Sequence, residues 1–224
     1  MELELSNPWK NFEYSEYMVH SSDLNAFESH NARASMKTKF IPFLTPEPWI
    51  GNTESSVVVL LANPGATKEN VQGVREKNPA RIDLSIRNLH QDQMEYPHYF
   101  LDPRLEDDPG GKWWRRSLGG LIKKTSLSRV ASNILSLESI PYHSNQFEAP
   151  AESISTQEYT RQILKDSISR EAFIVIYRQP EFWFSQVPEL VNYPHKTSEP
   201  NTTQSVWITD GNLKNGYNEI LSRL

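Results

Sequence analysis

The residues of this sequence that could do chemistry stand just after apolar runs, and the clearest case follows residues 57–61. That run of valine and leucine leads into Asn63-Pro64-Gly65. Proline fixes φ and glycine adds freedom, so this turn is tight and can bring backbone and the Asn63 amide close to a ligand. The amide there can face a ligand at the carboxyl edge of the sheet. The alternative for Asn63 is a purely structural turn.

Further polar residues follow the later apolar runs. Glu138 lies near the end of residues 130–141, His143 comes directly after them, and Asp210 and Asn212 follow residues 204–209. A carboxylate accepts hydrogen bonds and cannot donate them, so Glu138 would accept from a donor such as an amino group. Pairing with an arginine, or exposure to solvent, is the alternative for Glu138. His143 would line a base pocket or bond a phosphate.

A serine hydrolase is the rival interpretation of Tyr142-His143-Ser144. Neighbouring residues of an extended chain point to opposite sides, and the sequence contains no Gly-x-Ser-x-Gly elbow. It contains no Gly-x-Gly-x-x-Gly or Walker motif either, so dinucleotide and nucleoside triphosphate binding have little support. These reaction classes are therefore set aside.

The elements that must position these residues alternate between strands and helices. The strands are predicted from apolar runs, and the run over residues 56–61 is also β-branched and bounded by turn residues. The predicted strands are 56–61, 130–141, 172–178 and 204–212, and the predicted helices are 11–36, 115–124, 156–170, 180–191 and 215–224.

Such alternation predicts an α/β fold, a three-layer α/β/α sandwich with a central four-stranded, mostly parallel sheet. We expect a single domain over residues 1–224, in which residues 1–50 form a helical and connector extension. Ligands of such sheets bind beyond the carboxyl ends of the strands, which is where Asn63, Glu138, His143 and Asp210 fall.

Composition excludes several kinds of site. The chain has no cysteine and its six histidines show no metal-binding spacing, so we expect neither a metal nor a cofactor. No apolar run is long enough to span a membrane and no signal peptide is evident, so a cytoplasmic protein is expected.

The net charge of −5 hides one basic stretch, residues 109–137, which has no acidic residue. Trp113-Trp114-Arg115-Arg116, together with Lys112, mixes aromatic and cationic side chains as a surface facing DNA phosphates does. A solvated helix face is the alternative. DNA is the expected partner.

The segment "LLANPGAT" resembles the first motif of the uracil-DNA glycosylase superfamily, in its Gly-x-Asn-Pro-Gly form. Asn63, Pro64 and Gly65 match, while Leu61 or Ala62 stands in the place of the leading glycine. The order of the predicted strands extends the resemblance over about residues 40–224. The resemblance implies that Asn63 holds the attacking water and that Pro64 and Gly65 belong to the base-binding site.

The later motifs depart from this family. Glu138 stands where the family has a base-reading residue, commonly asparagine for uracil, and "ITDGNLKNG" replaces the family's His-Pro-Ser. In that position the Glu138 carboxylate would repel uracil O4 and accept from an exocyclic amine such as cytosine N4. By this resemblance Asp210 takes the histidine's position, Asn212 contacts substrate, and Leu213 with Lys214 forms the wedge inserted as the base flips. An ordinary Asp-Gly turn is the alternative.

Tyr99 and Phe100 are the candidates for stacking on the flipped base, with core packing as their alternative. The sequence thus predicts a monomeric, metal-free, monofunctional DNA glycosylase. Its expected substrate is a modified or amino-bearing pyrimidine, such as a bulky cytosine derivative of phage DNA, which would suit genome defence. The alternatives are a non-catalytic DNA- or nucleotide-binding protein of this fold and a plain uracil-DNA glycosylase of base-excision repair.

Overall fold

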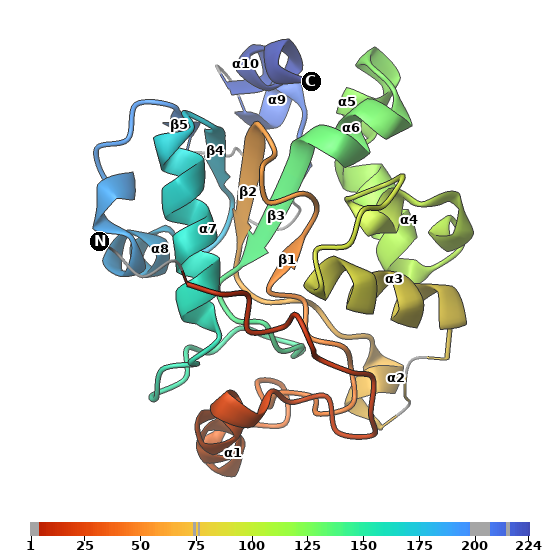
Figure 1. Cartoon of the computed structure of the whole chain (residues 1–224), viewed down its shortest axis with the longest axis vertical. Coiled ribbons are helices and arrows are strands. Elements are labelled where there is room, and N and C mark those ends of the chain that lie inside the picture. The colour runs from red at the N-terminus through yellow and green to blue at the C-terminus, as the bar shows by residue number, and fades with distance from the viewer. Residues whose placement is uncertain (1–4, 74, 76, 198–206, 214–215) are drawn as a thin grey trace. The chain divides into compact units, whose positions relative to one another are not determined.

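A computed structural model describes residues 5–73, 75, 77–197, 207–213 and 216–224 of the chain (Figure 1). The chain divides into two compact units, each built from three stretches. Unit 1 consists of Met1–Trp49, Ala62–Asp92 and Glu138–Gln162, and unit 2 of Ile50–Leu61, Gln93–Leu137 and Ile163–Leu224.

The predicted α/β class is confirmed, but the sheet is mixed and the described residues give it five strands rather than four. Its order is β1-β3-β2-β4-β5, and β4 pairs in parallel with both β2 and β5. The strands are β1 (Trp49–Ile50), β2 (Val57–Leu61), β3 (Ile134–Glu138), β4 (Phe173–Ile176) and β5 (Lys196–Thr197).

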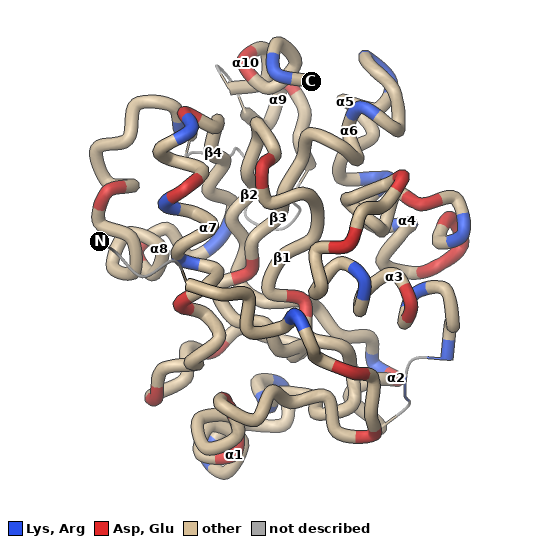
Figure 2. The backbone as a smooth tube through the Cα atoms, in the orientation of Figure 1, with Lys and Arg blue, Asp and Glu red and all other residues tan. Residues whose placement is uncertain are grey.

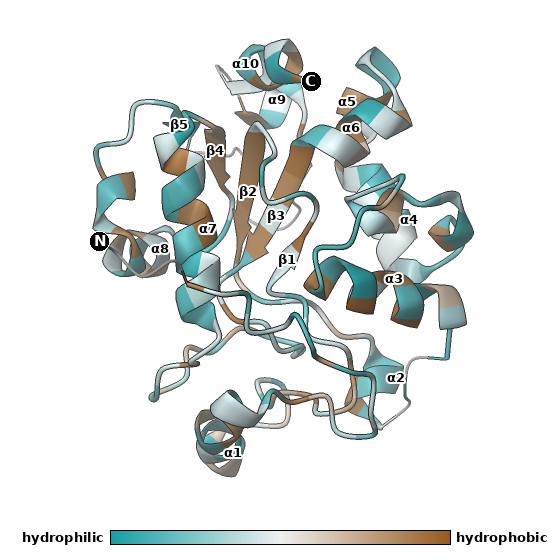
Figure 3. Cartoon of the chain, in the orientation of Figure 1, coloured by the Kyte–Doolittle hydropathy of each residue, from teal (hydrophilic) through white to brown (hydrophobic). Residues whose placement is uncertain are grey.

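The three longer strands form because their sequences are almost wholly apolar, and every residue of β2, β3 and β4 is buried. Continuous burial of this kind is typical of strands covered on both faces. Figure 3 shows these strands among the most hydrophobic elements of the chain. β1 and β5 are each two residues long, which is too short for hydrophobic periodicity in the sequence to predict them.

The predicted strand over residues 204–212 is wrong in its described part. Residues 207–209 form no strand, and Asp210–Leu213 form helix α9. Thr209 starts this helix, since its hydroxyl accepts from the Asn212 amide at 3.3 Å and its carbonyl from the Leu213 amide at 3.0 Å. Threonine at such an N-terminus favours a helix over continuation of a strand.

The helices of unit 2 also refine two predictions. The predicted helix 115–124 is two helices, because the chain breaks at Leu118 before Gly119-Gly120. The predicted strand 130–141 begins as a helix and becomes extended only at Ile134. The helices here are α4 (Pro109–Ser117), α5 (Gly119–Lys124), α6 (Leu127–Asn133), α8 (Pro180–Gln186), α9 and α10 (Gly216–Arg223), with 3₁₀ turns η2 (Tyr99–Leu101), η3 (Pro103–Leu105) and η4 (Pro188–Leu190).

Unit 1 has fewer regular elements and is held by buried polar contacts. Asp23 is fully buried and accepts hydrogen bonds from the Tyr142 hydroxyl at 2.7 Å and from the Thr156 amide and hydroxyl at 3.0 and 2.7 Å. The elements here are η1 (Ser21–Asp23), α1 (Leu24–Arg33), α2 (Lys68–Val71) and α3 (Pro79–Leu89), and α7 (Gln157–Ser169) begins in this unit. The predicted helix 11–36 is therefore real only over its second half.

None of the helices in the described residues is both long and apolar enough to cross a membrane. The same residues contain no group of three or more histidine, aspartate or glutamate side chains placed to hold a metal ion.

Candidate functional site

The turn after β2 lies in unit 1 and runs beside residues 142–144. Gly65 and Ser144 form a parallel bridge, and the Ser144 amide donates to the Pro64 carbonyl at 3.2 Å. The two strand ends are joined as well, because Ala62 O accepts from the Ile140 amide at 3.0 Å. The fold thus places the segment containing Asn63 against the segment containing His143.

The Asn63 side chain is fixed through its nitrogen. Nδ2 donates to Ser144 Oγ at 2.9 Å, and the carbonyl oxygens of Pro64 and Tyr142 lie 3.1 and 3.4 Å from it. Ser144 Oγ already donates to the Gln146 carbonyl at 2.7 Å, so it accepts from Asn63. All partners of Nδ2 are therefore acceptors, which sets the orientation of the amide.

This orientation leaves the Asn63 carbonyl oxygen available. Oδ1 accepts no hydrogen bond from the residues that the structure describes, and the side chain is half-buried. An amide held rigidly by its nitrogen, with its oxygen unoccupied, is suited to accept a hydrogen bond from a water or a ligand. A surface asparagine in a plain turn would not need three acceptors around one nitrogen.

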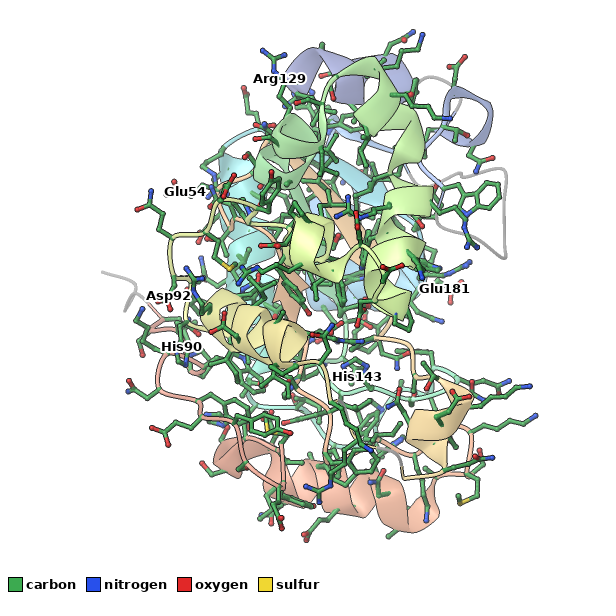
Figure 4. All side chains as sticks on the ribbon, turned by 90° about the vertical axis from the view of Figure 1, so that its right-hand side faces the viewer. Glu54, His90, Asp92, Arg129, His143 and Glu181 are labelled. Atoms are coloured by element: carbon green, nitrogen blue, oxygen red, sulfur yellow. The ribbon has the colours of Figure 1, made fainter. Side chains whose placement is uncertain are left out.

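His143 is buried directly beside this turn. Its Nδ1 lies 2.8 Å from Gly65 O and its Nε2 lies 3.0 Å from Thr45 O. Carbonyl oxygens only accept, so in either tautomer the ring donates to one of these two carbonyls. Figure 4 shows His143 in the interior of unit 1, whereas His90 and Asp92 lie at its edge. With 2% of its surface exposed, His143 holds the turn and is closed to a phosphate.

Two buried carboxyl groups, Glu47 and Glu138, belong to the same unit. Glu47 Oε1 lies 3.3 Å from the Arg81 guanidinium and 3.7 Å from His143 Nε2, so the guanidinium faces Glu47. Glu138 is 4% exposed, and its Oε2 has no hydrogen-bond partner among the described residues. Burial raises the pKa of Glu138 well above its usual value, and the charge of Glu47 raises it further.

Asn63, His143 and Glu138 therefore belong to one polar cluster of unit 1. Hydrogen bonds join Asn63 to Ser144 and Gly65 to His143. His143 lies close to Glu47, and the charge of Glu47 acts on Glu138. We call these residues, together with Arg81, the turn cluster. The alternative in which Glu138 pairs with an arginine is not seen among the described residues, where Arg81 faces Glu47. Glu47 and Arg81 were not predicted, since they are 34 positions apart and their pairing is hidden in the sequence.

Tyr99 and Phe100 lie in unit 2 and are buried in its core. Their rings stack on each other with centroids 4.4 Å apart, and Phe100 also packs against α4 at Gly110. Neither ring presents a free face on which a base could stack. For these two residues the core-packing alternative describes what is observed.

The predicted base-flipping loop also lies in unit 2. Asp210 is exposed at the start of α9. The side-chain amide of Asn212 donates from Nδ2 to Trp207 O at 2.9 Å. Leu213 is 1% exposed, so it packs into the unit and does not project as a wedge. Lys214 lies outside the described residues.

The predicted DNA-binding cations divide by role. Arg115 donates to the carbonyls of Leu101 and Asp102 at 2.8 and 2.9 Å, which ties α4 to the turns before it. Arg116 is exposed, and so is Lys112, which pairs with Asp107 at 3.0 Å. Figure 2 shows basic residues along α4 and α5 and acidic residues in the loop before α4. The basic stretch is thus bordered by acidic side chains.

Comparisons with protein-family models, with curated proteins and with solved structures found no match for this chain.

Proposed function

We propose that this chain is a monofunctional DNA glycosylase, which hydrolyses the N-glycosidic bond of a flipped pyrimidine and leaves an abasic site. The observation that supports this proposal best is the Asn63 amide, which is held by its nitrogen at the end of a central strand while its oxygen accepts no hydrogen bond from the described residues. The resemblance of Asn63-Pro64-Gly65 to the first motif of the uracil-DNA glycosylase superfamily points to the same chemistry.

In this proposal Asn63 Oδ1 accepts a hydrogen bond from the attacking water. The C–N bond to the base breaks, a C–O bond forms at the anomeric carbon, and the base takes the electron pair of the broken bond. The water's proton passes to solvent or to the departing base. Because the transition state is oxocarbenium-like, positioning of the water matters more than full deprotonation, and an amide is sufficient.

The base would lie at the strand-end turn, where Pro64 and Gly65 bring the backbone close and Glu138 lies nearby in the same unit. DNA phosphates would be contacted by exposed cations such as Lys112 and Arg116. We include in the proposal a monomeric, cytoplasmic protein with a three-layer fold, acting on modified cytosines of phage DNA.

The test is excision from a panel of duplexes that carry uracil, 5-hydroxymethylcytosine or its glucosylated form, followed by alkaline cleavage of abasic sites. We expect strand cleavage with at least one duplex, and excision of uracil alone would assign the protein to base-excision repair. Tight DNA binding without cleavage of any duplex would instead support the non-catalytic binding protein.

A further inference from the structure

Two tryptophans of unit 2 are exposed at its surface. Trp113 of α4 is 38% exposed and Trp207, which precedes α9, is 43% exposed. The other four tryptophans of the chain are at most 4% exposed: Trp9, Trp49, Trp114 and Trp183. The main chain of Trp207 is held in place, because its carbonyl accepts from the Tyr177 hydroxyl and from Asn212 Nδ2. Exposed tryptophans on an ordered main chain are typical of binding surfaces.

The fold brings the segment containing Trp207 to the C-terminal end of α4. The Ile208 amide donates to the carbonyl of Ser117, the last residue of α4, at 2.9 Å. The Ile208 carbonyl oxygen lies against Gly120 of α5, where a β-carbon would stand 3.1 Å from it. Trp113 precedes Ser117 by four residues, which is about one turn of the same helix. The two exposed tryptophans therefore come from neighbouring parts of unit 2.

Most exposed cations of the basic stretch have no acidic partner. Residues 109–137 contain six of the chain's 23 basic residues and none of its 28 acidic ones. Arg115 is used within the fold, Lys112 pairs with Asp107, and Asp210 is the exposed acid after Trp207. Four exposed cations of α4, α5 and α6, which follow one another in unit 2 (Figure 1), form no ion pair with the described residues: Arg116, Lys123, Lys124 and Arg129. This positive surface favours an anionic partner.

We propose that Trp113, Trp207 and these four cations form a docking surface for single-stranded DNA, in which the indoles stack on unpaired bases and the cations contact phosphates. This inference deepens the proposed function, on which it rests for the choice of DNA. Phosphate contacts alone would suit a duplex equally well. The bases of a duplex are already stacked on one another, so an indole finds an open base face only in a single strand, and every base offers such a face.

An anionic membrane fits this surface less well. A helix that binds at a membrane interface buries a wide apolar face among the lipids. The apolar residues of α4 and α5 that could form such a face, Trp114, Leu118 and Leu121, are buried in the unit instead. The surface thus offers flat aromatic rings among cations, the combination with which proteins bind single strands.

The surface is tested by fluorescence anisotropy of a labelled oligothymidine strand and of the same strand annealed to its complement. We expect wild type to bind the single strand more tightly than the duplex. Trp113→Ala and Trp207→Ala should each weaken single-strand binding by about 5- to 150-fold and leave duplex binding unchanged. Tyr14→Ala, which removes an exposed ring of unit 1, should match wild type.

The phosphate contacts are tested by charge reversal. Arg116→Glu should weaken single-strand binding and reduce the slope of log affinity against log salt by about 0.7, the value for one lost phosphate contact. Lys39→Glu makes the same change of charge at an exposed position of unit 1 and should have neither effect.

Equal affinity for strand and duplex, or unchanged affinity in both tryptophan variants, would overturn the inference. Tighter binding of an oligouridine RNA strand or of anionic lipid vesicles would overturn the choice of partner. Single-strand binding without excision of any base would refute the proposed function and leave this surface standing. Excision from duplexes without single-strand binding would refute only the surface.

Discussion

The side-chain nitrogen of Asn63 lies 2.9 Å from the hydroxyl oxygen of Ser144, across a parallel bridge that joins the turn after β2 to the segment after β3. The serine hydroxyl is committed to Gln146 O and therefore only accepts from Asn63. Residues 81 positions apart thus fix which way the Asn63 amide faces.

Replacement of Ser144 by alanine should loosen this amide. The Asn63 nitrogen would lose one acceptor and the Gln146 carbonyl its donor, so excision should slow about tenfold in kcat, with KM little changed. Steady-state kinetics measures this effect, and Ser153→Ala, at an exposed position of the same unit, is the matched control. An unchanged kcat in Ser144→Ala would show that the contact does not position Asn63.

Removal of the Tyr142 hydroxyl should weaken unit 1. Tyr142→Phe takes one of three short hydrogen bonds from the fully buried Asp23 carboxylate, and a bond to a charged group is worth about 1.5–3 kcal/mol. Urea unfolding should show a decrease of this size in the free energy of unfolding. Tyr14→Phe, at an exposed ring, should stay within about 0.5 kcal/mol of wild type, and equal losses in both variants would contradict this role for Asp23.

Acid should destabilise the fold through His98. Burial lowers the pKa of this ring from 6.5 to about 3, so between these values the unfolded chain binds a proton that the folded chain does not. Stability should therefore fall by about 1.4 kcal/mol for each unit of pH lowered through this window.

The measurement is urea unfolding at steps of pH from 7 to 4. His98→Gln should remove this slope. The control His195→Gln, at a half-buried ring, should show the same slope as wild type. A wild-type slope that survives in His98→Gln would assign acid sensitivity to other groups.

Glu138 should produce the opposite dependence. Its folded pKa is raised, so above the ordinary value of 4.5 the unfolded chain has lost a proton that the folded chain keeps. The contribution of Glu138 to folding stability is fully present below pH 4.5 and is lost as the pH rises towards the folded pKa. From pH 4 to 7 the free energy of unfolding of Glu138→Gln should therefore rise relative to that of wild type. A constant difference would mean that Glu138 is ionised in the folded protein.

The sequence predicts the parts of this fold that depend on continuous apolar runs. Val57–Leu61 and Phe173–Ile176 are apolar and wholly buried, and both strands were predicted within two residues. The predicted helix 11–36 fails in its first half because Trp9, Phe12 and His20 pack their rings on one another in an irregular segment. Spacing of apolar residues does not distinguish such a cluster from a helical face.

The sequence identifies candidate site residues only where they follow a predicted strand. Asn63, Glu138 and His143 follow apolar runs, and the fold brings them into one cluster. The raised pKa of Glu138 could not be read from the sequence, because it depends on burial and on the distant Glu47, whose partner Arg81 is also remote along the chain. Tyr99 and Phe100 match a stacking role by type alone, and their burial decides against it.

The most direct test of the central claim is the single-turnover rate of abasic-site formation on the best duplex of the panel, compared between wild type, Asn63→Ala and the exposed control Asn145→Ala. Loss of the water-positioning oxygen should slow Asn63→Ala by about 10²- to 10³-fold, an effect typical of removing one preorganised polar group, while Asn145→Ala matches wild type. Excision by Asn63→Ala at the wild-type rate would contradict the account.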